Sequence, residues 1–162
     1  MRYQMKERLF SFGDDFAILD DAGNQAYYVD GRAFSIGDKL SLLDPAGNEV
    51  AFIRQKLLAI GPTYEIHRAG QLAAIVKKHL FTFFHQRFSV DVPGPDDLEA
   101  RGDFLQMEYT FTRHGAPVAL VSKRWFRLAD TYGIDILPDQ DDILILASAV
   151  VIDLVAHPDR KG

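Results

Sequence analysis

Three pairs of cationic side chains recur at similar points of the sequence, each at the end of an apolar stretch. They are Arg54 with Lys56, Lys77 with Lys78, and Lys123 with Arg124. If the apolar stretches are the second strands of hairpins that stay in register, equivalent positions fall along one rim of the sheet. Cations gathered on one rim can bind a phosphorylated headgroup or an anionic membrane surface. The alternative is that charged strand ends keep the sheet soluble and prevent edge pairing.

Two acidic clusters are the candidates for a cation site. One holds Asp96, Asp97, Glu99 and Asp103, and the other holds Asp135, Asp139, Asp141 and Asp142. Calcium takes about six to eight oxygen ligands from a tightly turned segment, and the spacing of an EF-hand is absent from both clusters. Turn formation and helix capping explain these residues, so we predict no metal site. Calcium is less firmly excluded than the transition metals.

Residues for catalysis or transition-metal binding are few. The chain has no cysteine, which removes thiol nucleophiles, Cys-based zinc sites and disulfides. His79 and His85 lie six residues apart, too far for an ordinary pair of close ligands, and we expect them at the surface or a rim. The serine-hydrolase, phosphate-loop and zinc-protease motifs are absent. We therefore predict a protein that is not an enzyme and that has no cofactor.

Composition indicates one globular domain spanning residues 1–162. Of the residues, 48% are hydrophobic and 25% are charged, and the formal net charge of -5 argues against binding to nucleic acid. The N-terminus shows no pattern of a secretory signal, and the apolar run 143–156 is shorter than the ~20 residues that a membrane span requires. These features predict a cytoplasmic protein, either free or bound peripherally to a membrane.

Glycine spacing predicts the elements that must position these residues. Gly23, Gly47, Gly70, Gly94 and Gly115 lie between apolar stretches at intervals of 24, 23, 24 and 21 residues. Each interval suits two short strands and two turns, and glycine supplies the positive φ of a tight turn. Alternating patterns at 63–68 and 108–113 are typical of half-buried strands. Residues from about 5 to 137 therefore have room for ten to twelve strands, and a sheet that large usually curls or closes.

The C-terminal segment has a different pattern. Residues 140–157 predict a helix with Asp139 as its N-cap and Pro158 after its end. The segment is apolar on nearly every side, and such a helix must be surrounded by protein. One apolar helix and many curling strands suggest a barrel with the helix inside. Asp153 then needs a partner or a position near the barrel mouth.

Aromatic residues are dense at 81–88. Strand alternation would place Phe81 and Phe83 on one side, and Phe84 and Phe88 on the other. We expect them in the core and against the helix. An exposed patch for a membrane or a partner is the alternative.

An ordered series of short segments resembles the LURP-one-related family. This family is a branch of the tubby C-terminal-like superfamily, which also includes the phospholipid scramblases. The segments are Met5-Lys6-Glu7, Leu9-Phe10, Leu43 to Asn48, Ile53 to Lys56, Tyr64-Glu65-Ile66, Val76-Lys77-Lys78, Val121 to Phe126, Asp130 to Ile136, Asp141-Asp142 and Ile152-Asp153. The resemblance implies a closed antiparallel barrel of about twelve strands around a central C-terminal helix.

The resemblance implies less about function. Tubby-like barrels bind phosphoinositides, and scramblases are linked to calcium-dependent lipid movement, but this chain lacks the cysteine-rich and proline-rich segments of the scramblases. Our expectation is a non-enzymatic binding module for anionic lipid headgroups at Arg54, Lys56, Lys77, Lys78, Lys123 and Arg124. The alternatives are a protein-interaction module and a calcium-linked protein that moves lipids.

Overall fold

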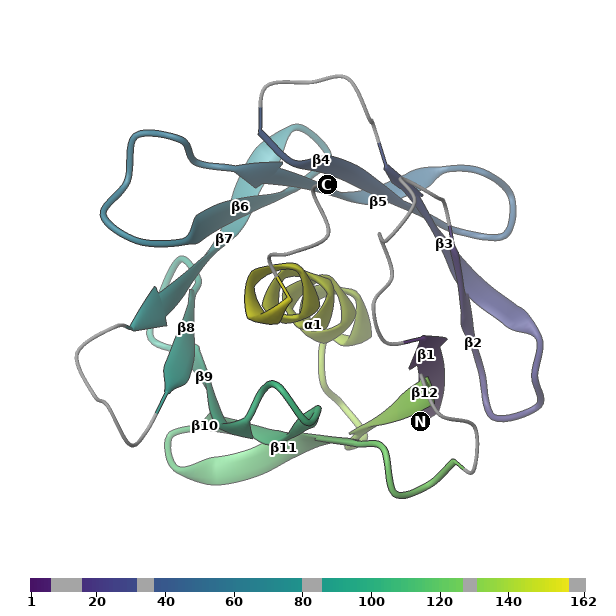
Figure 1. Ribbon diagram of the computed structural model, residues 1–162. Coiled ribbons are helices and arrows are strands. Elements are labelled where there is room, and N and C mark those ends of the chain that lie inside the picture. Colours follow the sequence, from purple (N-terminus) through teal and green to yellow (C-terminus); the bar gives the residue numbers. More distant parts are fainter. Residues whose placement is uncertain (7–15, 32–36, 80–85, 127–130, 158–162) are drawn as a thin grey trace.

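The computed structural model describes residues 1–6, 16–31, 37–79, 86–126 and 131–157, which form twelve strands and one helix (Figure 1). The strands are β1 (Arg2–Lys6), β2 (Phe16–Leu19), β3 (Gln25–Gly31), β4 (Lys39–Leu43), β5 (Glu49–Gln55), β6 (Thr63–Arg68), β7 (Gln71–His79), β8 (Arg87–Asp91), β9 (Leu98–Asp103), β10 (Glu108–Arg113), β11 (Ala116–Ser122) and β12 (Thr131–Ile136). The helix is α1 (Asp142–Ala156).

The strands form one closed antiparallel barrel. Each strand pairs with its neighbours in the chain, and β1 closes the circle by pairing with β12, where Tyr3 lies opposite Ile134. Closure removes the free sheet edges that would otherwise pair with other chains. The predicted mainly β barrel of about twelve strands is therefore confirmed.

Strand alternation separates the inside of the barrel from the outside. In β6, Tyr64 and Ile66 are buried in the interior, whereas Glu65 and His67 are partly exposed. The strand predicted at 108–113 is β10, with Tyr109 and Phe111 in the core. The two-residue period thus predicted the inward faces of both strands correctly.

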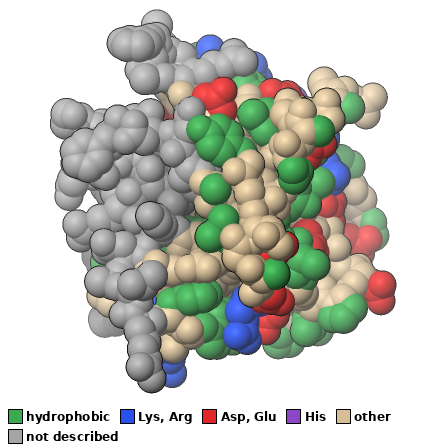
Figure 2. All heavy atoms as spheres, turned by 90° about the vertical axis from the view of Figure 1, so that its right-hand side faces the viewer, with side chains coloured by type: hydrophobic (Ala, Val, Ile, Leu, Met, Phe, Trp, Pro, Cys, Tyr) green, Lys and Arg blue, Asp and Glu red, His purple; other side chains and the backbone are tan. Residues whose placement is uncertain are grey.

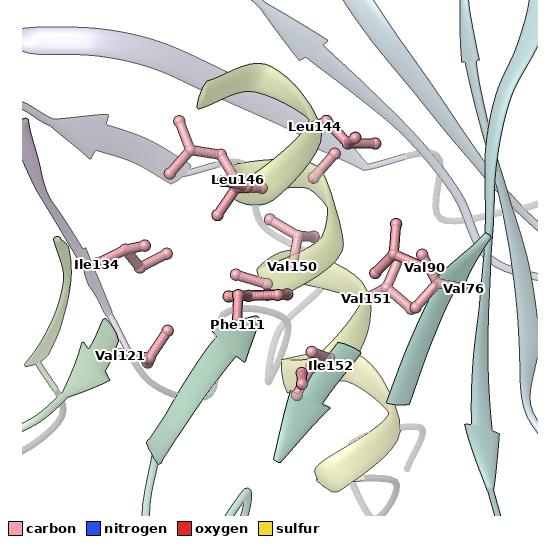
Figure 3. Packing of buried hydrophobic residues seen from close by; sticks show 14 of the residues in the cluster. Val76, Val90, Phe111, Val121, Ile134, Leu144, Leu146, Val150, Val151 and Ile152 are labelled. Atoms are coloured by element: carbon pink, nitrogen blue, oxygen red, sulfur yellow. The ribbon is translucent and has the colours of Figure 1, made fainter. Parts of the chain in front are cut away.

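Helix α1 fills the barrel (Figures 1 and 3). Every residue from Leu144 to Asp153 is buried, and Val150, Val151 and Ile152 lie among side chains of the surrounding strands (Figure 3). The helix has no polar face because strands of the barrel surround it on all sides. In the described residues no helix has the length and apolar character needed to cross a bilayer.

The N-cap is Asp141, so the prediction of Asp139 is wrong. The Asp141 side chain accepts a hydrogen bond from the amide of Leu144, with Oδ1 3.2 Å from the nitrogen. Asp139 instead occupies the turn before the helix with a φ of 65°, a conformation unsuited to an N-cap. The helix ends at the C-cap His157, and Pro158 lies outside the described residues.

The partner predicted for Asp153 is present, whereas only one of the aromatic residues predicted for the core is described. Asp153 is fully buried, and its Oδ1 lies 2.8 Å from Nδ1 of His157, so a partner in the next helical turn replaces contact with solvent. Phe88 lies in the core, with its ring 4.8 Å from that of Phe104. Phe81, Phe83 and Phe84 lie outside the described residues.

Candidate anion-binding rim

The six predicted cations lie at one end of the barrel. Because neighbouring strands are antiparallel, all odd-numbered strands finish at the same end. Arg54 is the penultimate residue of β5, and Lys56 directly follows that strand. Lys77 and Lys78 are near the end of β7, and the pair Lys123 and Arg124 follows β11. We call this the cationic end, and the opposite end, where even-numbered strands finish, the acidic end.

The six cations do not form one cluster. Strands β5 and β7 are separated only by β6, but β11 is six strands away from β5 around the circle of twelve. Figure 1 shows β5 and β11 on opposite walls of the barrel. The cationic end therefore has two sectors: a β5–β7 sector with Arg54, Lys56, Lys77 and Lys78, and a β11 sector with Lys123 and Arg124.

Carboxylates compensate several of these cations. An Nη2 atom of Arg54 lies 2.8 Å from Oε1 of Glu65 on the outer face of β6. Lys77 Nζ is 3.9 Å from Asp91 Oδ2, and Arg124 Nε is 3.9 Å from Glu108 Oε1. Of these three contacts, that of Arg54 is the strongest, because it is a short charge-assisted hydrogen bond.

The formal net charge of -5 does not show how the charges are distributed between the two ends of the barrel. Every lysine whose side chain the structure describes lies at the cationic end: Lys39, Lys56, Lys77, Lys78 and Lys123. The turns and helix start at the other end carry Asp20, Asp21, Asp44, Asp96, Asp97, Asp139, Asp141 and Asp142, whereas the turn aspartates Asp38 and Asp103 lie at the cationic end. Figure 2, which views the wall of β2 and β3, shows Asp and Glu side chains scattered over the described part of this face.

Aromatic residues after β11 pack on the outer wall. Arg2 lies over the Trp125 ring, with its guanidinium carbon 4.3 Å from the ring centroid. Trp125 and Phe126 also cover Gly133, where an added Cβ would lie 2.5 Å from a Trp125 ring atom. Trp125 is therefore held against the barrel beside the β11 sector.

The β5–β6 loop, residues 56–62, stands on a hydrogen-bonded base at the cationic end. The Tyr64 hydroxyl donates to Asp38 Oδ2 at 2.5 Å, and the Asp38 amide donates to Gln55 Oε1 at 3.2 Å. The amide of Lys56 donates to Thr63 O at 2.9 Å, and that of Lys78 donates to Pro62 O at 3.2 Å. Burial and the hydrogen bond to Asp38 raise the pKa of Tyr64 well above its usual range, so this hydroxyl stays a donor.

The same loop carries an apolar tip, which we define as residues 57–60. Leu57, Leu58 and Ile60 are 56%, 97% and 98% exposed. Leu57 lies against Gly37, but Leu58 and Ile60 have almost no cover. The motifs and periods of the sequence did not predict this feature. Its signal was a Leu-Leu-Ala-Ile run in a segment between two strands, where polar turn residues are usual.

The residues of the acidic clusters mostly have structural partners. Asp97 Oδ1 accepts from the Val92 amide at 2.8 Å, and Glu99 Oε1 lies 2.6 Å from Arg87 Nη1. Asp141 lies 2.6 Å from Arg68, and Asp142 accepts from the Tyr3 hydroxyl at 2.6 Å. Across residues 1–6, 16–31, 37–79, 86–126 and 131–157, no group of three or more His, Asp or Glu side chains is placed to hold a metal ion.

A pocket of about 490 Å³ lies at the acidic end, beside the start of α1. Tyr27, Asp139 and Asp142 are among its lining residues. Burial and the Asp142 carboxylate raise the pKa of Tyr27. An anion would meet several carboxylates here, so this pocket does not suit the ligand expected for the cationic end.

The two histidines considered as metal ligands are not brought together by any described contact. Nε2 of His79 lies 2.8 Å from the Ser89 hydroxyl, on the neighbouring strand β8. Burial lowers the pKa of His79, and the Arg87 guanidinium adds to the effect. His85 lies outside the described residues.

Comparison with known proteins places this barrel in a family. A sequence model of LURP-one-related proteins matches residues 1–153. The chain belongs to the LURP-one-related family. One relative is the Bacillus subtilis (strain 168) protein named "Uncharacterized protein YxjI", which is 34% identical over 156 residues that cover 96% of this chain and 94% of that protein.

A solved structure supports the fold of this LURP-one-related chain. It is the X-ray structure of a protein from Arabidopsis thaliana, with a TM-score of 0.65 and 21% sequence identity. The match covers 93% of this chain and 88% of the plant protein. At this identity the likeness establishes the barrel and its central helix.

The Arg54–Glu65 pair of this LURP-one-related barrel predicts a pH dependence of stability. The hydrogen bond from Arg54 lowers the pKa of Glu65 below its ordinary 4.5. A carboxylate with a lower pKa in the folded chain stabilises the fold above the unfolded value, and this stabilisation is lost as the pH falls through the folded value.

We therefore expect Glu65→Gln to lower the free energy of unfolding at neutral pH by up to about 1 kcal/mol, because Arg54 is half exposed. The difference from the unsubstituted protein should vanish in acid. Urea titrations of both proteins at neutral pH and below the folded pKa test this. An equal difference at both pH values would show that packing, and not the charge of Glu65, is responsible.

Proposed function

We propose that this LURP-one-related protein is a non-enzymatic module that binds anionic lipid at its cationic end. The observation that carries the proposal is the charge polarity of the barrel: the described lysines lie at one end, and most aspartates of the turns lie at the other. A chain with net charge -5 can still dock on an anionic surface, because charges beyond a Debye length of ~10 Å are screened.

The position of the two sectors favours a surface over a single headgroup. Lys56 and Lys78 lie across the barrel end from Lys123 and Arg124, so one phosphate cannot contact both pairs. An anionic bilayer that covers the end contacts both. The expected ligand is therefore an anionic membrane surface, bound peripherally.

Vesicle sedimentation tests this proposal. Wild-type protein should bind vesicles of phosphatidylcholine with phosphatidylserine, should bind less as salt rises, and should leave pure phosphatidylcholine vesicles unbound. Lys56→Gln with Lys78→Gln removes two cations, each worth ~1 kcal/mol at an anionic surface, and should weaken binding about thirtyfold. Lys123→Gln with Arg124→Gln should weaken it by a smaller factor, because Glu108 already offsets Arg124.

A matched control removes two cations from the acidic end. Arg68→Gln with Arg113→Gln changes the net charge equally, at the last residues of β6 and β10, which lie at the opposite end. This variant should bind like the wild type. An equal loss of vesicle binding in this control and in Lys56→Gln with Lys78→Gln would show that net charge alone governs binding. Failure of the wild type to bind any anionic vesicle would refute the proposal and leave a protein-interaction module as the alternative.

A further inference from the structure

We propose that the apolar tip, residues 57–60, inserts into the apolar part of a lipid bilayer when the cationic end docks. This inference rests on the function proposed above and identifies the partner as an intact bilayer rather than a soluble headgroup. The β5–β6 loop would be the part of the barrel that enters the membrane.

The exposure of the tip is the first support. Single exposed apolar residues are common on protein surfaces, but Leu58 and Ile60 are almost completely exposed and lie two residues apart on one loop. Leu57 adds a third apolar side chain at 56% exposure. Packing within the barrel explains only Leu57, through its contact with Gly37.

The base of the loop is already ordered, which is the second support. Hydrogen bonds from Tyr64 to Asp38 and from Asp38 to Gln55 lie directly beneath the loop. The amides of Lys56 and Lys78 bind the backbone at the far end of the loop, at Thr63 and Pro62. A tip on such an ordered base enters a lipid bilayer without the entropic cost of ordering the loop.

The charges beside the tip select a bilayer as the partner. Lys56 directly precedes the tip and is exposed, and Lys78 adjoins the end of the loop through its backbone. Exposed apolar side chains flanked by lysines match the depth profile of an anionic membrane, where headgroups overlie hydrocarbon. The tip has only four residues, whereas a stable protein interface needs about 800 Å² from each partner.

Fluorescence from the tip tests insertion directly. The chain has no cysteine, so Leu58→Cys provides a single attachment point for an environment-sensitive dye. Mixing with phosphatidylcholine–phosphatidylserine vesicles should shift the emission to the blue, and lipids brominated in their acyl chains should quench it. The matched control is Asn48→Cys, labelled in the β4–β5 turn at the acidic end, where neither effect should occur.

A second pair of variants measures the contribution of the tip to binding. Leu58→Ser with Ile60→Ser should weaken binding to the same vesicles by about tenfold or more, since two large apolar side chains no longer leave water. Its thermal midpoint should match that of the wild type, because both residues make few contacts in the fold. Leu137→Ser, at a half-exposed leucine of the acidic end, is the control and should bind normally.

The outcomes separate the two proposals. If the wild type binds anionic vesicles while the label at position 58 stays unshifted and the double serine variant binds normally, insertion is refuted and the proposed function stands. That result would assign the tip to contact with a protein. If the wild type binds no vesicle, the proposed function and the insertion both fail. Binding of soluble inositol phosphate as tightly as vesicles would also overturn insertion.

Discussion

A chain truncated after Pro138 is expected not to fold, because it lacks the helix that fills the barrel. Six large side chains of α1 are buried: Leu144, Ile145, Leu146, Val150, Val151 and Ile152. At ~1.5–3 kcal/mol each, their burial contributes about 9–18 kcal/mol. This matches or exceeds the entire stability of a typical domain, about 5–15 kcal/mol, so the strands alone cannot compensate for the loss.

The matched control is a chain that ends after His157, which keeps the whole of α1 and its C-cap. It should unfold cooperatively in urea, whereas the shorter chain should be insoluble or show no cooperative transition. Circular dichroism and analytical gel filtration of both chains provide the measurement. A soluble, cooperatively unfolding chain of residues 1–138 would refute the view that the helix is the core of the barrel.

Gly102→Ala is expected to destabilise the barrel by about 2–5 kcal/mol. An added Cβ would lie 2.5 Å from the Glu108 carbonyl oxygen and 2.6 Å from Tyr109 Cα, both in the paired strand β10. The backbone φ of Gly102 is 145°, a conformation that residues other than glycine rarely adopt. Strain of about 1–3 kcal/mol and overpacking of about 1–2 kcal/mol therefore add at one position.

The comparison that isolates the close approach is Gly47→Ala. Gly47 also has a positive φ, 86°, but nothing lies within 4 Å of an added Cβ. The Gly47→Ala substitution should lower the free energy of unfolding by about 1 kcal/mol or slightly more, from backbone strain alone. Chemical denaturation of the two variants measures the difference. Equal losses would mean that β9 shifts away from β10 at little cost.

The Gly102 position also supports the aromatic part of the core. Tyr109, opposite Gly102, has its ring 4.9 Å from that of Phe104 and 5.6 Å from that of Phe111. Displacing Tyr109 would therefore disturb a chain of ring contacts beneath β9 and β10. The near-ultraviolet circular dichroism of Gly102→Ala should change for this reason, while that of Gly47→Ala should not.

Much of the fold was predictable because it depends on local patterns. The two-residue period of Thr63–Arg68 and Glu108–Arg113 identified strands and their inward faces, since one face of each strand must leave water. The all-round apolarity of α1 required a position inside other elements. The N-cap was assigned two residues early, because Asp139 and Asp141 both have capping side chains and only the backbone decides between them.

The candidate site was predictable only in part. The hairpin period correctly placed Lys77, Lys78, Lys123 and Arg124 at one end, because strands alternate in direction. Their division into two sectors depends on how many strands lie between β7 and β11, which is a property of the closed circle. The ion pair between Arg54 and Glu65 likewise depends on the register of β5 with β6.

The sequence by itself determined the closed barrel, its buried helix and the end of the barrel where the cations gather, because the strands alternate with a period of 2 and the helix is apolar on nearly every side. Only the tertiary structure decided which cations adjoin, which are held by carboxylates, and that Leu58 and Ile60 project from the end where the lysines lie. These features depend on strand register and loop conformation, which contacts between distant residues establish and no local pattern encodes.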